Sequence, residues 1–162
     1  MDDELSEWTD GNDMNCQMLV VCHSIWYDAD RPERGFSLGR VIARLVPEVQ
    51  TEFPLRMPRL FAYAQLFGAA GDHTLRVVVL AVGQSDIGEE VVTHLGEDGE
   101  ALEYGPYHVE LISEDYLFEI TFPLAQLRFP TPGIYEVQLH LESELESEPI
   151  ARTRFQVMER VS

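Results

Sequence analysis

The segment GIYEVQLHLE, residues 133–142, alternates apolar and polar side chains with a period of two along its length. Successive side chains of a β-strand point to opposite faces of a sheet, whereas an amphipathic helix needs apolar residues three or four positions apart. The pattern therefore predicts a strand with one buried and one solvated face. The expected core side consists of Tyr135, Val137, Leu139 and Leu141. The expected solvated side consists of Glu136, Gln138, His140 and Glu142.

Similar apolar, β-prone runs recur along the chain and predict further strands. They are CQMLVVCHSIWYD (16–28), RLFAYAQLFG (59–68), TLRVVVLAVG (74–83), EVVTHL (90–95), YHVELI (107–112), YLFEITFPL (116–124) and ARTRFQVME (151–159). The segment SLGRVIARLVPEV, residues 37–49, fits either a short helix or a strand. We expect a strand, because Pro47 limits a helix there.

Eight or nine short strands joined by turns rich in Gly and Pro, with no long helix, predict an all-β fold. We expect a two-sheet antiparallel sandwich, with a closed barrel as the alternative. The turn AAGDH, residues 69–73, predicts a hairpin between the runs on either side of it. Residues 1–14 are acidic and aperiodic, which predicts a flexible tail followed by a single domain over residues 15–162. The stretch GEDGEALEYGP, residues 96–106, predicts a mobile loop.

The chain of 162 residues carries a formal net charge of −18. Residues 31–76 hold seven arginines against four acids, while residues 77–162 hold seventeen acids against four arginines. Such an acidic surface repels phosphate backbones and anionic lipid, so binding to nucleic acid or to a membrane surface is disfavoured. No stretch approaches the roughly 18 consecutive apolar residues that a membrane helix needs.

Two cysteines are too few for a disulfide framework. Cys16 and Cys22 lie on one expected strand, where six residues separate them by roughly 20 Å, so they cannot pair with each other. The start of the chain, MDDELSEWTDGND, lacks the apolar region of a secretory signal. We therefore expect a soluble cytoplasmic protein with reduced thiols.

The stretch LESELESEP, residues 141–149, places a glutamate at every second position. We expect an antiparallel hairpin with the last strand, closed by a short loop at residues 147–149. The expected cross-strand pairs are Leu139–Val157, Leu141–Phe155, Glu142–Arg154 and Glu144–Arg152. Alternate carboxylates on a strand lie about 6.6 Å apart along the backbone. Calcium instead needs six to eight converging oxygens at about 2.3–2.6 Å, so the glutamates predict a solvated strand face and no metal site.

The segment LAQLRFPTPGIYEV, residues 124–137, sets Tyr135 just after a Pro/Gly corner. This resembles the tyrosine corner of immunoglobulin-like sandwiches, where the hydroxyl bonds to upstream backbone. The resemblance implies that residues 116–124, 133–142 and 151–157 correspond to strands E, F and G. Val137 stands where an antibody domain has its second cysteine, which excludes a disulfide core.

A looser resemblance covers most of the chain. The segments MLVVCHSIWYD, FPLRMPRLFAYAQLFGAAGDHTLRVVVL and FPTPGIYEVQLHLE, with ARTRFQV near the C-terminus, are similar to an uncharacterised bacterial family of small immunoglobulin-like β-sandwich domains of unknown function. The resemblance implies a fold and brings no catalytic residue with it.

The sequence contains no recognisable catalytic motif. The candidates for ligands or bases are His23, His73, His94, His108 and His140. No two of them have the spacing that would direct both at one metal from a single element, although a site assembled from distant strands stays open. No serine or cysteine lies in a nucleophile motif, and no glycine-rich phosphate loop is present. We expect no enzymatic activity, no cofactor and no metal.

Two segments are candidate interaction surfaces. DADRPERGFSLGR, residues 28–40, is an arginine-bearing loop, and EFPLRMPRLF, residues 52–61, interleaves Arg with Met, Pro and Phe. Arg, Met and aromatic residues are enriched at protein interfaces. The alternative is an irregular crossover between the sheets. The residues that we expect to form the surface are Phe36, Phe53, Arg56, Met57 and Arg59.

Three functions remain open. The first and preferred one is a non-catalytic protein-interaction or assembly domain that binds a protein partner or a second copy of itself. The second is a small-ligand or carbohydrate-binding sandwich with an aromatic platform of Trp26, Tyr27, Tyr104 and Tyr107. The third is an acidic decoy that occupies a nucleic-acid-binding site of a partner. It is supported by residues 77–127, which contain eleven acids and no Arg.

Overall fold

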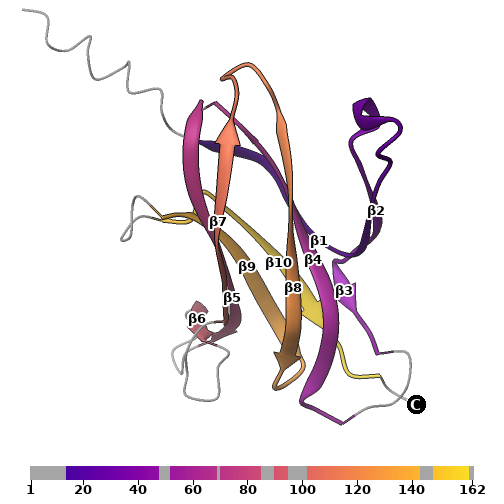
Figure 1. Ribbon diagram of the computed structural model, residues 1–162. Coiled ribbons are helices and arrows are strands. Elements are labelled where there is room, and N and C mark those ends of the chain that lie inside the picture. Colours follow the sequence, from indigo (N-terminus) through magenta and orange to yellow (C-terminus); the bar gives the residue numbers. More distant parts are fainter. Residues whose placement is uncertain are drawn as a thin grey trace, which may run out of the picture.

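The computed structural model describes residues 14–47, 52–68, 70–84, 90–94, 102–142 and 148–160. Two sheets pack face to face (Figure 1), with strand orders β2-β1-β4-β8 and β3-β10-β9-β5-β6, and β7 also pairs with β5. The first sheet contains β1 (Asn15–Tyr27), β2 (Phe36–Val41), β4 (Leu55–Phe67) and β8 (Phe118–Phe129). The second contains β3 (Arg44–Leu45), β5 (Gly71–Gln84), β6 (Glu90–His94), β7 (Leu102–Leu111), β9 (Gly133–Leu141) and β10 (Ala151–Val157). The expected all-β, two-sheet architecture is confirmed.

The pairing is antiparallel except between β3 and β10, which run parallel. The only helical element in the described ranges is the short 3-10 helix η2 (Pro32–Arg34), at the tip of the β1–β2 hairpin. The expected tail, residues 1–14, lies outside the described residues except for Met14, which is buried in the core.

The expected hairpin between residues 59–68 and 74–83 is wrong. These runs form β4 and β5, which lie in different sheets, and His73 belongs to β5 and not to the turn. Gly68 and Gly71 have φ of 98° and 111°, a conformation that glycine adopts without steric cost, and they carry the chain across. A Gly-rich turn indicates a reversal but does not decide whether the next strand pairs with the previous one.

The described part of the ambiguous segment, residues 37–47, forms strands, as expected, but it divides between the two sheets. β2 pairs with β1, whereas β3 pairs with β10. The connection is held by Ile42, whose N–H donates to the carbonyl of Val21 at 2.7 Å. Of the expected mobile loop 96–106, residues 102–106 belong to β7 instead, and residues 96–101 lie outside the described residues.

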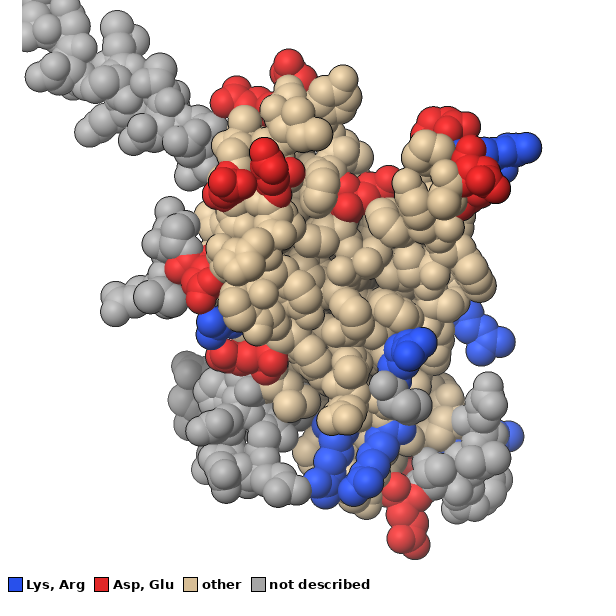
Figure 2. All heavy atoms as spheres, in the orientation of Figure 1, with Lys and Arg blue, Asp and Glu red and all other residues tan. Residues whose placement is uncertain are grey.

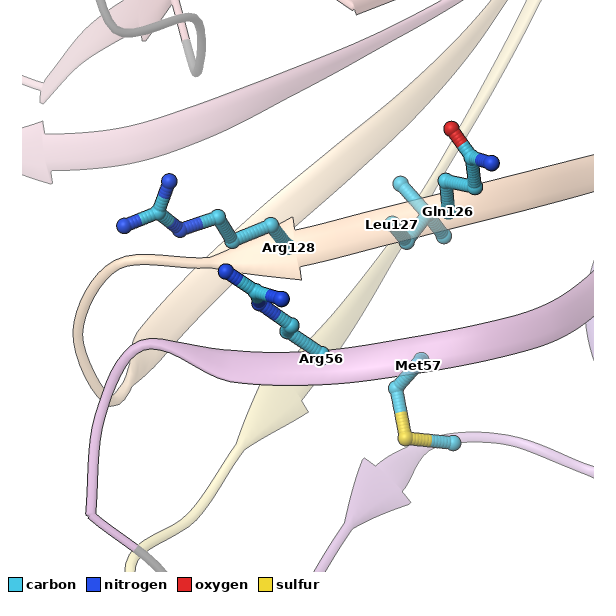
Figure 3. Close-up of a pocket in the computed structure, with 5 residues that line it drawn as sticks. All are labelled: Arg56, Met57, Gln126, Leu127 and Arg128. Atoms are coloured by element: carbon cyan, nitrogen blue, oxygen red, sulfur yellow. The ribbon is translucent and has the colours of Figure 1, made fainter.

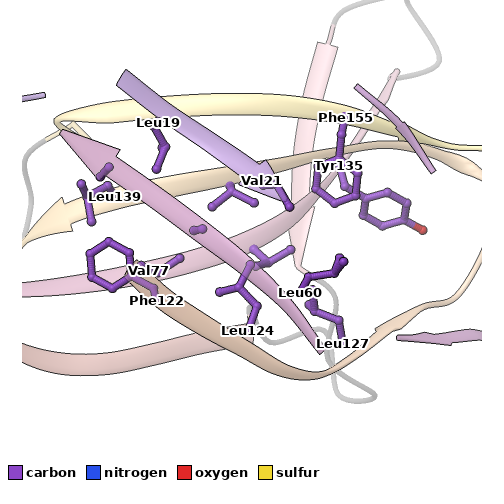
Figure 4. Packing of buried hydrophobic residues seen from close by; sticks show 14 of the residues in the cluster. Leu19, Val21, Leu60, Val77, Phe122, Leu124, Leu127, Tyr135, Leu139 and Phe155 are labelled. Atoms are coloured by element: carbon purple, nitrogen blue, oxygen red, sulfur yellow. The ribbon is translucent and has the colours of Figure 1, made fainter. Parts of the chain in front are cut away.

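The core lies between the sheets (Figure 4), and from Leu60 to Leu66 of β4 every second residue belongs to it. Its inward residues Ala62 and Ala64 are small, and each faces large neighbours: Ala62 is opposite Phe122 of β8, and Ala64 is opposite Leu19 of β1. Alternating small and large side chains lets the facing layers interdigitate at the density of a protein interior.

β9 and β10 pair as expected, but their predicted register is wrong by six residues. Phe155 lies opposite Tyr135 and Arg154 lies opposite Glu136, so the loop is longer than residues 147–149. An even shift leaves every side chain on its predicted face, so alternation alone cannot fix the register. Glu142 instead binds Arg76 of β5, with 2.9 Å between Oε1 and Nη2, and Glu144 is outside the described residues.

The solvated side predicted for β9 is wrong at one position. Glu136 is 0% exposed. One carboxylate oxygen accepts from Nε of Arg154 at 2.9 Å, and the other accepts from the amide of Gln138 at 2.5 Å. Val78 and Leu80 of β5, opposite Gln138 and Glu136, are buried on this same outer face, so apolar neighbours exclude water around the carboxylate.

Tyr135 makes the backbone contact that its position predicted. Its hydroxyl donates to the carbonyl oxygen of Thr131 at 2.5 Å, and its ring packs on Phe129 and Phe155 with centroids 4.7 and 6.2 Å away. The contact ties the turn between β8 and β9 to the core.

Candidate binding hollow on the first sheet

A local break in alternation shapes the lower end of the first sheet. Leu60 faces Leu124, both fully buried. Three residues along each strand, Met57 faces Leu127, again on the core side. In a regular strand, residues three apart point to opposite faces, so both strands must be irregular between these two pairs. Gln126 accommodates the change on β8 with a φ of 58°, in the left-handed region.

Five side chains line a hollow of about 420 Å³ at this irregularity: Arg56, Met57, Gln126, Leu127 and Arg128. We call it the arginine hollow. Figure 3 shows Arg56 and Arg128 reaching out side by side from neighbouring strands, while Met57 points the other way from β4. The volume lies within the range of about 300–1,000 Å³ that ligand pockets occupy.

The arginine hollow concentrates positive charge in an acidic protein. Arg56 and Arg128 are direct cross-strand partners, and Arg59 is exposed two residues along β4 from Met57. Like charges placed directly opposite one another in a sheet are destabilising. On the face in Figure 2, arginines gather toward the lower end, and acidic side chains dominate around the upper ends of β7 and β8. The arrangement suits an anionic group with an apolar part.

The structure divides the predicted interaction surface in two. Arg56 and Met57 line the arginine hollow, Arg59 lies beside it, and Phe53 is half-buried against the core. Phe36 lies elsewhere on the same sheet. The irregular-crossover alternative is not what the segment forms, because residues from Leu55 onward belong to β4.

Phe36 fastens the β1–β2 hairpin to the outer face of the first sheet. Its ring packs against Tyr27 and Tyr63 with centroids 5.1 and 6.4 Å away. Its backbone N–H donates to the carboxylate of Glu119 at 3.5 Å, and the hydroxyl of Tyr63 donates to the same carboxylate. Burial, and then the bond to Glu119, raise the pKa of Tyr63 to about 12. Phe36 is therefore a packing residue in this fold.

Sequence reasoning missed Gln126 and Arg128, which lie about seventy residues after Arg56 in the chain. The segment LAQLRF contains a usable signal. Leu124 and Leu127 are three apart in an otherwise alternating strand, and this spacing indicates a local break in alternation. The cross-strand partner of Arg56 depends on the register of β4 and β8, which no local pattern gives.

Tyr104 holds the free edge of β8 next to the hollow. Its hydroxyl donates to the carbonyl of Ala125, the residue before Gln126, at 2.8 Å. Burial, followed by the nearby Tyr107, raises the pKa of Tyr104 to about 12, so the hydroxyl stays protonated and keeps donating at physiological pH. An edge strand with unpaired carbonyls invites pairing with another chain, and this bond occupies one of them.

The four residues of the predicted aromatic platform occupy two places. Trp26 and Tyr27 are exposed at the end of β1 in the first sheet. The Tyr104 hydroxyl is hydrogen-bonded to the Ala125 carbonyl, and the Tyr107 ring packs edge-on against Phe122 with centroids 4.9 Å apart. The two pairs therefore present no common stacking surface.

Within the described ranges, no group of three or more His, Cys, Asp or Glu side chains is arranged to hold a metal ion. His108 shares a hydrogen bond of 3.1 Å with Thr74, and His140 one of 2.9 Å with Gln138. Cys16 and Cys22 are free thiols, and burial raises the pKa of both. No helix in the described part of the chain is long and apolar enough to span a membrane.

No protein-family model matches this chain, and no curated protein matches it. Among solved structures it is similar to a chain of the Pseudomonas fluorescens alkylpurine DNA glycosylase AlkC bound to DNA containing an abasic site analog, with 13% identity and a TM-score of 0.45. The likeness covers 89% of this chain and 30% of that chain, so this chain spans less than a third of the length of its neighbour. A TM-score of 0.45 is too low to carry an inference about function.

Proposed function

We propose that this chain is a non-catalytic protein-interaction domain, and that the arginine hollow is its binding site for an acidic segment of a partner protein. The observation that carries the proposal is the direct cross-strand pair of Arg56 and Arg128 at the hollow. A carboxylate that contacts a guanidinium group gains charge-assisted hydrogen bonds.

The net charge of the molecule favours a short acidic segment over a polyanion as the partner. A charge of −18 repels a polyanion such as nucleic acid at long range. A short segment with one or two carboxylates is repelled far less, and at contact it meets the arginines of the hollow. At physiological salt the Debye length is about 8 Å, so charges further away than this are largely screened and the arginines in contact with the segment dominate. The hollow therefore favours an isolated acidic-apolar motif.

Binding of a defined peptide tests this proposal. The probe is a fluorescent peptide with two adjacent carboxylates between leucines, Leu-Glu-Asp-Leu, followed by anisotropy at 0.15 M salt. We expect saturable binding with a dissociation constant below about 1 mM. Changing both Arg56 and Arg128 to Glu is expected to weaken binding at least tenfold.

The matched control changes Arg31 and Arg34, both exposed on the β1–β2 hairpin, to Glu, which alters the net charge equally. This control is expected to bind like the wild type. Equal weakening by both double variants would contradict the proposal, because it would mean that the peptide responds to overall charge and not to the hollow. An oligothymidylate of eight nucleotides should not bind.

We also propose that the sandwich is immunoglobulin-like and acts in the cytoplasm. The β4–β8 and β5–β9 pairings, the parallel pairing of β3 with β10 and the Tyr135 contact support the fold class, and two free thiols support a reducing compartment. Amide contacts between Arg44 and Gln156 in NMR spectra test the strand arrangement. Thiol titration of protein isolated without reductant tests the redox state.

A further inference from the structure

The loop between β7 and β8, residues 112–117, exposes large apolar side chains at one end of the sandwich (Figure 1). Ile112 is 90%, Tyr116 71% and Leu117 46% exposed. The loop and the adjoining strand ends form a cavity of about 240 Å³, which is lined by Leu111, Ile112, Ser113, Tyr116, Leu117 and Phe118. Small-ligand pockets have volumes of roughly 300–1,000 Å³, so this tip cavity suits a single side chain of a partner better than a free ligand. We call residues 111–118 the apolar tip.

Acidic side chains lie beside the apolar tip. Glu114 and Asp115, the two loop carboxylates, are exposed. Glu110, which directly precedes the tip, and Asp72 of β5 are also exposed, and these two lie directly opposite each other. Within the described ranges, none of the four carboxylates forms an ion pair. Figure 2 shows acidic side chains around the upper ends of β7 and β8, where the tip lies.

The Asp72–Glu110 pair is unfavourable in the free protein, because like charges directly opposite each other in an antiparallel pair are destabilising. A cation that contacts both side chains would replace this repulsion by charge-assisted hydrogen bonds. The stretch of chain that carries the tip has the same bias, since residues 77–127 contain eleven acids and no Arg. The field around the tip therefore attracts a cationic partner.

We propose that the apolar tip docks a basic segment of a partner protein, in which a large apolar residue stands between arginines. The apolar residue enters the tip cavity and packs against Tyr116 and Leu117, while the flanking arginines bind the loop carboxylates and the Asp72–Glu110 pair. The tip is separate from the arginine hollow, because nine residues of extended β8 separate Leu117 from Gln126 by roughly 30 Å. Binding at the tip therefore does not depend on the arginine hollow.

Charge and exposed apolar surface together determine the class of partner. The net charge of −18 repels nucleic acid, anionic lipid and a second copy of the chain. A basic peptide is attracted instead, and the exposed tyrosine and aliphatic side chains of the tip give it apolar surface to bury. Tyrosine on this side and arginine on the partner are among the residues that contribute most to protein interfaces.

Binding of two matched peptides tests the role of the tip cavity. The first is fluorescent Arg-Arg-Leu-Arg-Arg, followed by anisotropy at 0.15 M salt, and we expect saturable binding with a dissociation constant below about 1 mM. The second has Ser in place of Leu and carries the same charge. It is expected to bind about tenfold more weakly, because it brings no apolar side chain to the cavity. Equal binding of the two peptides would overturn the proposal.

Matched variants separate the tip from the overall charge of the protein. The tip variant combines Glu114→Gln with Asp115→Asn, and its control combines Asp30→Asn with Glu33→Gln, two exposed acids of the β1–β2 hairpin. The tip variant is expected to bind the leucine peptide about tenfold more weakly, and the control within about twofold of the wild type. Equal weakening by both would overturn the proposal, because the peptide would then respond to net charge alone.

Two single changes test the remaining contacts. Ile112→Ser is expected to weaken binding of the leucine peptide about fivefold, whereas Val41→Ser, at a residue that is 57% exposed on β2, should leave it unchanged. Asp72→Asn is expected to raise the melting temperature and to weaken binding about threefold, a combination that a purely structural residue would not show. An Asp72→Asn protein that binds as tightly as the wild type overturns the part assigned to the Asp72–Glu110 pair.

Sedimentation equilibrium of the wild type and the tip variant distinguishes a foreign partner from a second copy. We expect both proteins to be monomeric at 0.15 M salt. Self-association of the wild type that the tip variant abolishes would overturn the proposal, because the tip would then bind a second copy.

Discussion

The fully buried carboxylate of Glu136 accepts a hydrogen bond from Nε of Arg154 at 2.9 Å across the β9–β10 pair. The arginine is 37% exposed, so water reaches the cation but not the anion. The pair stands on the face of the second sheet that alternation assigns to solvent. A shift of two residues that placed Gln156 opposite Glu136 would leave the carboxylate buried without a cation, so the pair disfavours that register.

Changing Arg154 to Ala is expected to lower the free energy of unfolding by about 3 kcal/mol, because it leaves a buried carboxylate without its cation. Arg152, on the same face of β10, lies opposite Gln138, and its change to Ala is expected to cost less than about 0.5 kcal/mol. Urea denaturation measures both. Replacing Glu136 by Leu together with Arg154 by Met should recover most of the loss, since an apolar pair needs no charge compensation. Equal losses in the two alanine variants would contradict the assigned role.

Changing Tyr135 to Phe is expected to cost about 1–2 kcal/mol, because it removes the bond to the Thr131 carbonyl and leaves the ring in place. The same change at Tyr116, which is 71% exposed, should be neutral within about 0.5 kcal/mol. Thermal unfolding followed by circular dichroism compares the two variants. A neutral Tyr135→Phe change would show that the hydroxyl does not hold the corner.

His140 is expected to make stability depend on pH. Burial is the largest cause that lowers the pKa of His140 below its ordinary value of 6.5, and Arg152 and Arg76 act in the same direction against Glu103. The unfolded chain then binds the proton more tightly than the folded chain. The contribution of His140 to the free energy of unfolding is therefore complete above pH 6.5 and is lost as the pH falls below that value. The hydrogen bond from His140 to Gln138 requires the neutral ring to carry its proton on Nε2 if the Gln138 amide donates to Glu136.

Urea denaturation of the wild type and of His140→Gln at pH 7.5 and 5.5 measures this dependence. The wild type should lose more stability than the variant between these two values. An NMR titration of the His140 ring should give a midpoint below 6.5. A midpoint above 6.5 would contradict the assignment of burial as the dominant cause.

Changing Arg56 to Glu is expected to stabilise the fold by up to about 1 kcal/mol, because it replaces a like-charge cross-strand pair by an opposite-charge pair with Arg128. The same variant should lose binding of the acidic peptide. Urea denaturation and anisotropy together test this combination. A variant that is less stable than the wild type would show that Arg56 is required for the fold and would weaken the case for a binding role.

The sequence by itself determined which residues alternate, and therefore the all-β class, two sheets and the core side of β9, where Tyr135, Val137 and Leu139 are buried. Alternation is a local property, because neighbouring side chains of an extended chain must point in opposite directions. The contact of Tyr135 with Thr131 was equally accessible, since it spans four residues around a Pro/Gly corner.

Only the tertiary structure decided which strands pair and in which register. Period two is unchanged by an even shift, so it allowed both the expected pairing of Glu142 with Arg154 and the observed pairing of Glu136 with Arg154. It also could not place β4 and β5 in different sheets, because that choice depends on the long-range fit of β4 to β1 and β8. The arginine hollow follows from the same long-range choice: Arg56 lies beside Arg128 because two strands distant in sequence align there.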